Sequence, residues 1–313
     1  MTCVICGSTK QSVIRDTLRY GVKRDVLRCS KCGLVFLASQ KGTDTYYAGK
    51  EYRKRHGPTP GKASSMREIF DAYFPHQGPI VKALKNHLRP GMSVLDVGCS
   101  TGHFLAALKG KVKTRVGLEL GQDEAAFIRK NLDFKVYTEP IESARIDEGP
   151  FDLVTAFQVL EHIPEPVSFL RGIAKNLKPN GLLYLELPNI DDALLSVFKV
   201  KGYADFYYRE PHVSYYSKNT LMALLRKTGF NGEVKTVQRY NFTNQMRWIL
   251  TGKPQTTFAQ GNGTPVLVTD ESVPSRIRAS LNVFFKDADI RYRKLIEQNG
   301  AGDNLTFLGR KTL

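Results

Sequence analysis

The sequence predicts an α/β protein built around a mainly parallel sheet, and three observations lead to that prediction. Short apolar runs alternate with amphipathic stretches from residue 93 onward. One of these runs leads into a glycine-rich turn, the kind of place where a ligand can approach the backbone. The composition, with 42% hydrophobic and 24% charged residues, is close to that of an average soluble globular protein, and 313 residues can hold one α/β domain with smaller appendages.

The alternating pattern defines the expected core elements. Apolar runs predict strands over Ser93–Val97, Thr114–Leu120, Lys135–Tyr137, Phe151–Phe157 and Leu182–Leu187. Helical spacing between them predicts helices over Phe104–Lys109, Asp123–Asn131 and Pro166–Leu177. Because strands that alternate with helices pair in parallel, we expect one sheet with helices on both faces.

Further elements flank this core. We expect helices over Ser64–Phe74, Pro79–Leu88 and Lys218–Thr228, and late strands over Glu233–Arg239 and Asn304–Gly309. The stretch Asn241–Asn299 has a mainly helical pattern, with a Gly/Pro/Thr-rich loop from Gly252 to Pro265. The predicted regions are a module over 1–38, a connector with N-terminal helices over 39–90, a core over 91–240 and a helical extension ending in a last core strand over 241–313.

The formal charge of +16 is unevenly distributed. Residues 1–60 carry +8 and residues 199–313 carry +9, while the middle of the chain carries −1. Basic ends around a neutral core favour an anionic partner, either a nucleic acid or a phosphate-bearing small substrate. The alternative is that these charges only keep the surface soluble.

Four of the five cysteines fall into two short pairs, Cys3-x-x-Cys6-Gly7 and Cys29-x-x-Cys32-Gly33. The two-residue gap lets both thiolates of a pair reach one ion, and the glycine tolerates the left-handed turn that follows. Four sulfurs close a tetrahedral site and leave no position for water or substrate. We therefore expect a structural Zn²⁺ site rather than disulfides or an iron–sulfur centre.

No apolar run approaches the length needed to cross a bilayer, and the first twenty residues contain Arg15, Asp16 and Arg19 rather than a secretory apolar segment. Paired cysteines that bind metal fit a reducing compartment. We expect a cytoplasmic protein without a membrane span.

A candidate ligand pocket lies at the turn after the first core strand. Val94–Phe104 runs from an apolar strand through Gly98 and Gly102 into a helix. The spacing is G-x-x-x-G, whereas a pyrophosphate-binding turn has G-x-G-x-x-G. About twenty residues later the second strand ends at Glu119, whose carboxylate can accept both hydroxyls of a ribose. An adenosine without phosphate fits this combination.

These motifs resemble the class I S-adenosylmethionine-dependent methyltransferases over about residues 76–240. The resemblance rests on five segments, "VLDVGCSTGHFL", "VGLEL", "FDLVTAFQVLEHIPEP", "NLKPNGLLYLELPN" and "PHVSYYSKNTLMALLRKTGF". The paired cysteines in front are similar to a branch with an N-terminal zinc-binding segment, found among sugar and natural-product methyltransferases. The resemblance implies a Rossmann-like class I methyltransferase sheet, a zinc-ribbon-like module and a helical C-terminal insertion.

The resemblance also implies a role for individual residues. Asp96 and the turn Gly98, Cys99, Ser100 and Gly102 would hold the methionine part of S-adenosylmethionine. Glu119 would bind the ribose and Leu120 would lie against the adenine. Pocket residues expected further along the chain are Glu139, Pro140 and Ile141, where the family usually has Asp in place of Glu139, and then Phe157 and Gln158. Cys99 is expected to be a small turn residue without a nucleophilic role.

Methyl transfer needs the acceptor lone pair in line with the S–CH3 bond, and a hydroxyl acceptor also needs a general base. His212 is the first candidate for base or acceptor ligand, and His162, after the fourth strand, is the second. Either could instead be a structural histidine bonded to a backbone carbonyl. His103 is expected to cap or pack, and four tyrosines near His212 could stack on the acceptor or pack in the core: Tyr207, Tyr208, Tyr215 and Tyr216.

The predicted function is methyl transfer to a small-molecule acceptor, a sugar or nucleotide-linked sugar in polysaccharide or natural-product biosynthesis. An RNA or tRNA methyltransferase is the alternative, favoured by the positive charge, although the sequence has no RNA-recognition signature. A non-catalytic binding module is a third reading, since fold alone does not establish function. The acceptor molecule and the oligomeric state cannot be read from the sequence.

Overall fold

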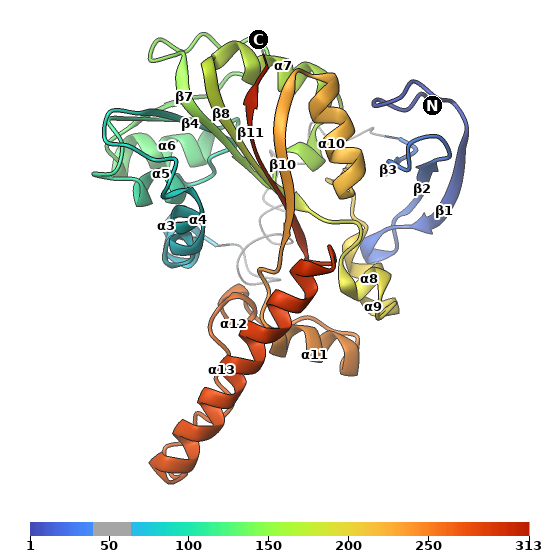
Figure 1. Ribbon diagram of the computed structural model, residues 1–313, viewed down its shortest axis with the longest axis vertical. Helices are drawn as coiled ribbons and strands as arrows, with labels where there is room; N and C mark the ends of the chain where they lie inside the picture. The colour runs from blue at the N-terminus through green and yellow to red at the C-terminus, as the bar shows by residue number, and fades with distance from the viewer. Residues whose placement is uncertain (40–63, 313) are drawn as a thin grey trace.

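The computed structural model describes residues 1–39 and 64–312 (Figure 1). The connector expected over residues 39–60 therefore falls almost entirely outside the described residues. The main sheet has seven strands in the order β10-β11-β8-β7-β4-β5-β6. Its parallel strands are β4 (Ser93–Val97), β5 (Thr114–Leu118), β6 (Lys135–Tyr137), β7 (Phe151–Phe157) and β8 (Leu177–Pro188). Strand β11 (Asn304–Lys311) runs antiparallel between β8 and β10 (Phe230–Val237). The predicted α/β sheet is confirmed.

Helices cover both faces of this sheet (Figure 1). On one face, a buried cluster joins Val94 of β4 to the helices α4 (Gly78–Leu84), α5 (His103–Ala107) and α6 (Gln122–Asn131). On the other face, Leu95 packs with α7 (Pro166–Asn176) and α10 (Lys218–Lys227). Neighbouring strand residues point to opposite faces, so one short apolar run serves two cores.

Two capping boxes fix where helices begin. Ser65 and Glu68 exchange side-chain and backbone hydrogen bonds at the start of α3 (Met66–Tyr73), and Ser217 and Thr220 do the same at the start of α10. Each box satisfies backbone N–H groups that have no partner inside the helix. Between α3 and α4 the chain makes a short 3-10 turn, η2 (Phe74–Gln77).

A second, antiparallel sheet has the order β1-β2-β3-β9. Its first strands, β1 (Gln11–Thr17) and β2 (Lys23–Cys29), are linked by η1 (Arg19–Gly21) and followed by β3 (Val35–Leu37). The fourth strand, β9 (Ser214–Tyr215), comes from the loop after β8, and Val35 pairs with Tyr215. The sequence did not predict β3 or β9. Strand β9 has only two residues, and its partner β3 lies far away in the chain.

The segments before α10 and after β10 form a helical end of the molecule. They comprise α8 (Ala193–Ser196), α9 (Lys201–Tyr207), α11 (Phe242–Thr251), α12 (Phe258–Asn262) and α13 (Ser275–Gln298). The predicted loop from Gly252 to Pro265 therefore contains the short helix α12, and α13 projects from the body as an arm (Figure 1). Over residues 1–39 and 64–312, no helix combines the length and apolar character that a membrane crossing requires.

Candidate functional site

The turn between β4 and α5 meets the end of β5. The backbone N–H groups of Gly98 and Cys99 donate to the Leu118 carbonyl at 2.7 and 3.2 Å. The Glu119 carboxylate then accepts a hydrogen bond from the N–H of Ser100 at 2.8 Å. We call Asp96, the 98–102 turn and Glu119 the carboxylate wall.

The two glycines of this turn are required by the protein itself. Gly98 and Gly102 have φ angles of +71° and +78°, in the left-handed region. A Cβ on Gly98 would lie 2.5 Å from Val159 Cγ2, and one on Gly102 would lie 2.7 Å from Phe134 Cζ. The sequence argument that these glycines make room for a ligand is therefore incomplete, because protein side chains already fill the space.

Asp96 is buried and Glu119 is half-buried. Desolvation raises the pKa of Asp96 to about 8; the hydrogen bond from Thr155 at 2.7 Å opposes that rise and the nearby charge of Glu119 adds to it. Desolvation also raises the pKa of Glu119, against the hydrogen bonds from the N–H groups of Gly121 and Ser100. A ligand that brings a positive charge and hydroxyl donors would relieve this desolvation, so the residues fit the aminoacyl and ribose parts of S-adenosylmethionine.

The other residues expected in the pocket differ in the exposure of their side chains. Leu120 is 57% exposed, so its side chain is available to cover a planar ligand. Glu139 and Pro140 are exposed and Ile141 is buried. Phe157 packs between Phe104 and Tyr184, while Gln158 has φ +54° and donates to Asn304 Oδ1 at 2.9 Å. Cys99 is buried, and desolvation raises its thiol pKa well above the usual value, which fits an inert turn residue.

A second group of polar side chains lies just beyond the end of β7. Glu161 and His162 belong to η3 (Leu160–His162), directly after Val159, which touches Gly98. The rings of His162 and His212 lie edge to face with centroids 4.8 Å apart. One ligand-type atom from each of Glu161, His162 and His212 lies within 4.8 Å of the others. Together with Arg209, we call these residues the histidine wall.

Hydrogen bonds fix the tautomers of both histidines. His162 Nδ1 lies 2.7 Å from the Pro211 carbonyl and must donate to it, so its Nε2 holds the lone pair. His212 Nε2 lies 2.8 Å from Arg209 Nε and 2.6 Å from a terminal guanidinium nitrogen. Because a guanidinium only donates, His212 Nε2 is an acceptor and its proton resides on Nδ1.

The electrostatics of the histidine wall favour neutral side chains. Desolvation and then the charge of Arg209 lower the pKa of His162 to about 3, against the Pro211 carbonyl. Desolvation raises the pKa of Glu161 to about 8, only partly opposed by Arg209. Both Glu161 oxygens are buried and have no hydrogen-bond partner among the described residues. A carboxyl group with a pKa near neutrality is suited to accept a proton.

Aromatic side chains lie beside the two walls. Tyr73 of α3 contacts His103 at 5.5 Å between ring centroids and Phe258 of α12 at 4.7 Å. Burial raises the pKa of Tyr73, and the charge of Arg209 partly opposes that rise, so Tyr73 lies within electrostatic range of Arg209. Burial lowers the pKa of His103 to about 4, in keeping with a packing role. Tyr207, Tyr215 and Tyr216 are buried in the core, and Tyr208 is half-buried.

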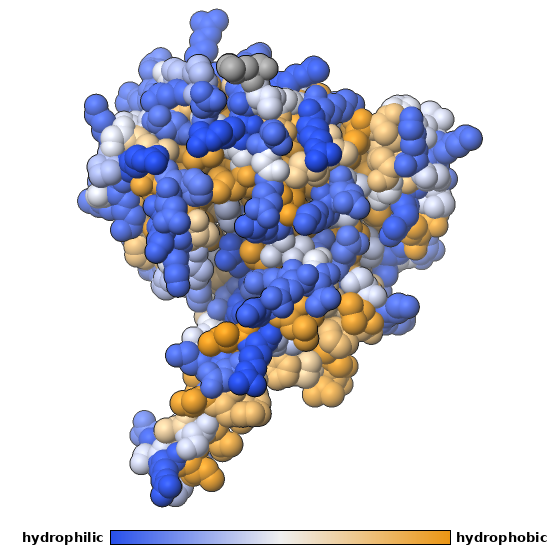
Figure 2. Space-filling model, in the orientation of Figure 1, coloured by the Kyte–Doolittle hydropathy of each residue, from blue (hydrophilic) through white to orange (hydrophobic). Residues whose placement is uncertain are grey.

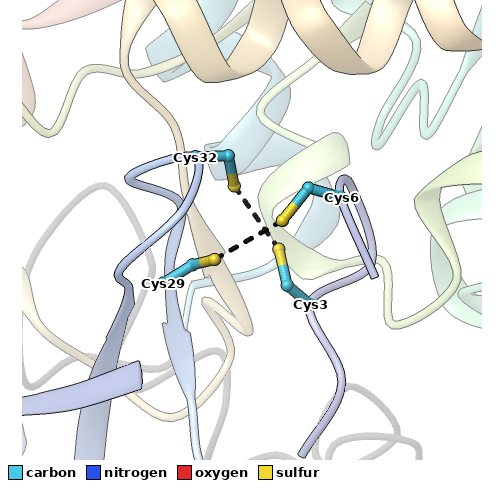
Figure 3. Close-up of side chains that lie close together, drawn as sticks. All are labelled: Cys3, Cys6, Cys29 and Cys32. Carbon is cyan, nitrogen blue, oxygen red and sulfur yellow. Dashed lines mark hydrogen bonds between the residues drawn. The ribbon is translucent and has the colours of Figure 1, made fainter. Parts of the chain in front are cut away.

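The four paired cysteines meet at one point (Figure 3). Sγ–Sγ distances are 3.5 Å for both Cys3–Cys32 and Cys6–Cys29. The two loops repeat one geometry, since the N–H of Gly7 donates to Cys3 and that of Gly33 donates to Cys29, both at 2.9 Å. Desolvation opposes ionisation of Cys29, but backbone N–H groups of Cys32 and Lys31 lower its pKa to about 6. Four converging sulfurs in this arrangement can hold a metal ion.

This cysteine cluster is joined to the histidine wall. Lys227 Nζ donates to the carbonyls of Val4 and Ile5 at 3.1 and 2.8 Å, and the N–H of Leu37 donates to the Val213 carbonyl at 3.0 Å. Val213 directly follows His212. The backbone on which His212 lies is therefore held by the sheet that the cysteines close.

Sequence reasoning missed two polar residues of the histidine wall, Glu161 and Arg209, and the aromatic Tyr73. The pair Glu161-His162 right after a strand was a usable signal for the first. Nothing in the local pattern around Arg209 or Tyr73 indicates their position, because each lies far from Glu161 and His162 in the sequence.

The chain is similar to known methyltransferases. A family profile described as a methyltransferase domain matches residues 74–234. A ubiquinone biosynthesis O-methyltransferase of Thiobacillus denitrificans is 28% identical over 162 residues, covering 48% of this chain and 69% of that protein. One from Photobacterium profundum is 26% identical over 171 residues, covering 51% and 72%. A solved SAM-dependent methyltransferase from Archaeoglobus fulgidus has a TM-score of 0.50 at 17% identity and covers 78% of this chain and 97% of that one, which shows a shared fold.

Proposed function

Because the chain belongs to the class I S-adenosylmethionine-dependent methyltransferases, we propose that it methylates a small-molecule acceptor, in the first place a hydroxyl of a sugar or nucleotide-linked sugar. The observation that carries the proposal is that the histidine wall adjoins the carboxylate wall through the contact of Val159 with Gly98. Bound S-adenosylmethionine supplies an electrophilic methyl group. The names of the two curated relatives, both O-methyltransferases, support an oxygen acceptor.

On the carboxylate wall, we assign cofactor binding as the resemblance implies. Asp96 and the 98–102 turn would hold the amino-acid part, and Glu119 would hold the ribose hydroxyls. Leu120 and Ile141 would border the adenine, with Glu139 and Pro140 at the rim. Phe157 and Gln158 would close the side toward the acceptor.

On the histidine wall, we assign contact with the acceptor to His212 first and His162 second. His212 would contact the acceptor as a hydrogen-bond donor through Nδ1–H, because its Nε2 accepts from Arg209. Arg209 orients the His212 ring through two hydrogen bonds and can stabilise negative charge on an acceptor oxygen. The low pKa of His162 makes it a weak base. Glu161 can act as the proton acceptor only in its ionised form, which its raised pKa of about 8 makes available near and above that pH. Proton removal by a positioned group contributes about 10²- to 10⁴-fold to a rate.

We further propose that Cys3, Cys6, Cys29 and Cys32 bind a structural Zn²⁺. Their spacing and their four converging sulfurs support this assignment. Reduced, metal-bound cysteines fit a cytoplasmic setting. The ion would hold the N-terminal strands β1, β2 and β3 in place beside β9 and would take no part in the chemistry.

The acceptor-side assignment is tested with His212→Ala. We expect turnover to fall at least about 100-fold, while the affinity for S-adenosylmethionine stays within about twofold, because His212 lies outside the carboxylate wall. His87→Ala is the matched control, since His87 lies by the cavity at the opposite end of the sheet with Asn180 and Arg310. Equal turnover in both variants would remove His212 from the mechanism.

The acceptor class is tested by offering the enzyme nucleotide sugars, small phenols and RNA with labelled cofactor. We expect label on a small molecule and only weak, strongly salt-dependent RNA binding from the basic chain ends. Label on RNA, with a tight site that survives moderate salt, would favour the alternative function.

A further inference from the structure

Helix α13 is anchored at one end and uncovered at the other. Near its C-terminal end, Asp289 accepts from the N–H of Phe242 at 2.7 Å and pairs with Arg293 at 2.9 Å, and Arg293 donates to the Gln238 and Arg239 carbonyls. Toward the free end, Asn282 bonds to the backbone of Leu267 and Val268. The arm is therefore positioned rigidly, and its outer half extends from the body (Figure 1).

An apolar stripe runs along this arm. Six large apolar side chains of α13 are exposed. Four of them fall within one narrow arc of the helix: Ile277 (52%), Leu281 (37%), Phe284 (64%) and Leu295 (58%). The other two, Val283 (58%) and Ile290 (54%), lie on a different face. The 24 residues of α13 span about 36 Å. A soluble surface seldom exposes so many large apolar groups in line, so the stripe indicates an interaction site.

The apolar surface continues onto the body beside the arm. Leu250 of α11 is 80% exposed, and Val197 and Phe198, which follow α8, are 61% and 40% exposed. Helices α8 and α11 are in contact. Figure 2 shows apolar residues both along the arm and over the adjoining part of the body. The whole end of the molecule beyond the carboxyl ends of the parallel strands thus presents apolar groups.

The charges around the stripe select among possible partners. Arg276, Lys286, Arg291 and Lys294 are exposed on α13, against the single exposed acid Asp287. The chain as a whole carries +16. A second copy would bring the same cations to the contact, whereas an anionic surface would be attracted. An apolar stripe flanked by Lys and Arg is the pattern of a helix that lies in a bilayer interface.

We propose that α13, with the exposed apolar residues beside α8 and on α11, docks on the surface of an anionic lipid bilayer. The helix lies in the interface with Leu281 and Phe284 among the acyl chains and its Lys and Arg side chains at the headgroups. This docking does not depend on the proposed methyl transfer.

The test is flotation of the full-length chain with vesicles, without cofactor or acceptor. We expect binding to vesicles of equal parts phosphatidylcholine and phosphatidylglycerol, little binding to pure phosphatidylcholine, and release at high salt. Leu281→Ser/Phe284→Ser should weaken binding about tenfold or more. The matched control is Val13→Ser/Tyr20→Ser, which removes two apolar groups exposed to 56% and 59% on the N-terminal module and should bind as the parent does.

Three results would overturn the proposal. The chain could fail to bind anionic vesicles, or it could bind them equally well after Leu281→Ser/Phe284→Ser. It could also form a dimer by light scattering that this double variant dissociates, which would assign the stripe to a second copy. Unchanged circular dichroism and cofactor affinity in the variants would show that none of these results comes from misfolding.

Discussion

The carboxylate wall comes from neighbouring strands of one sheet, whereas the histidine wall joins segments that are far apart in the chain. Asp96 and Glu119 lie at the ends of β4 and β5, which pair directly. Glu161 and His162 follow β7, and Arg209 and His212 precede β9, which pairs with β3 of the N-terminal module. The carboxylate wall therefore depends on one glycine turn, and the histidine wall depends on the closure of a distant cysteine cluster.

The largest expected effect comes from opening that cluster. Cys32→Ser should release the metal and loosen the β3–β9 pairing, so turnover should fall at least about 100-fold while cofactor affinity changes less than about threefold. Mass spectrometry measures the metal content, and calorimetry measures the affinity for the cofactor. Cys99→Ala, outside the cluster, should retain all the metal. Equal losses of turnover and cofactor affinity in Cys32→Ser would show that the two walls are not separate.

The carboxylate wall is expected to be sensitive to its glycines. Gly102→Ala places a Cβ 2.7 Å from Phe134 at a φ of +78° and should lower the free energy of unfolding by about 2 to 4 kcal/mol. Gly110→Ala is matched in φ, at +74°, but has open space around its Cβ, so only about 1 to 2 kcal/mol of backbone strain is expected. Urea unfolding of both variants measures the difference. Similar midpoints would mean that packing against Phe134 contributes nothing.

The histidine wall should make stability depend on pH. The pKa of Glu161 is raised to about 8, so the folded protein holds this proton and loses the associated stability as pH rises through that value. Glu161→Gln should therefore reduce the pH dependence of the unfolding free energy between about pH 5 and 8 by up to about 1.4 kcal/mol per pH unit. Glu165→Gln, at an exposed neighbouring position, should leave the slope as it is. An unchanged slope in Glu161→Gln would refute a buried neutral carboxyl group.

The smallest effect is expected where the module meets α10. Lys227→Ala removes two hydrogen bonds to the Val4 and Ile5 carbonyls and should cost about 1 kcal/mol, because the side chain is largely exposed. Faster metal release to a chelator is the measurement, with Lys218→Ala at the start of the same helix as control. Identical release rates would mean that the module is held by β3–β9 pairing and core packing alone.

The parts of the molecule that sequence predicts well are those made by local chain. The apolar run Ser93–Val97, its glycine turn and the acid at Glu119 are all within about thirty residues, so periodicity and spacing predict the sheet and its ligand turn. The two cysteine pairs were equally readable, because a two-residue gap lets both sulfurs of a pair reach one point. In both cases the physical constraint lies within one short segment.

What sequence could not predict depends on long-range pairing. Strands β3 and β9 have three and two residues, and β9 pairs with β3, a segment far away in the chain. The contact of Arg209 with His212 has a local spacing of three residues, yet its place beside Glu161 is set by β9 and the module. The sequence also could not predict that α13 projects from the body, because a helical pattern does not show which side of the helix packs against the rest of the protein.

Calorimetric titration with S-adenosylmethionine tests the central claim most directly, that the carboxylate wall is a cofactor site. We expect one site per chain that also binds the demethylated product, and a loss of affinity of about tenfold or more in Glu119→Gln, because the ribose hydroxyls would lose their anionic acceptor. Absence of heat with both ligands, or unchanged affinity in Glu119→Gln, would contradict this assignment.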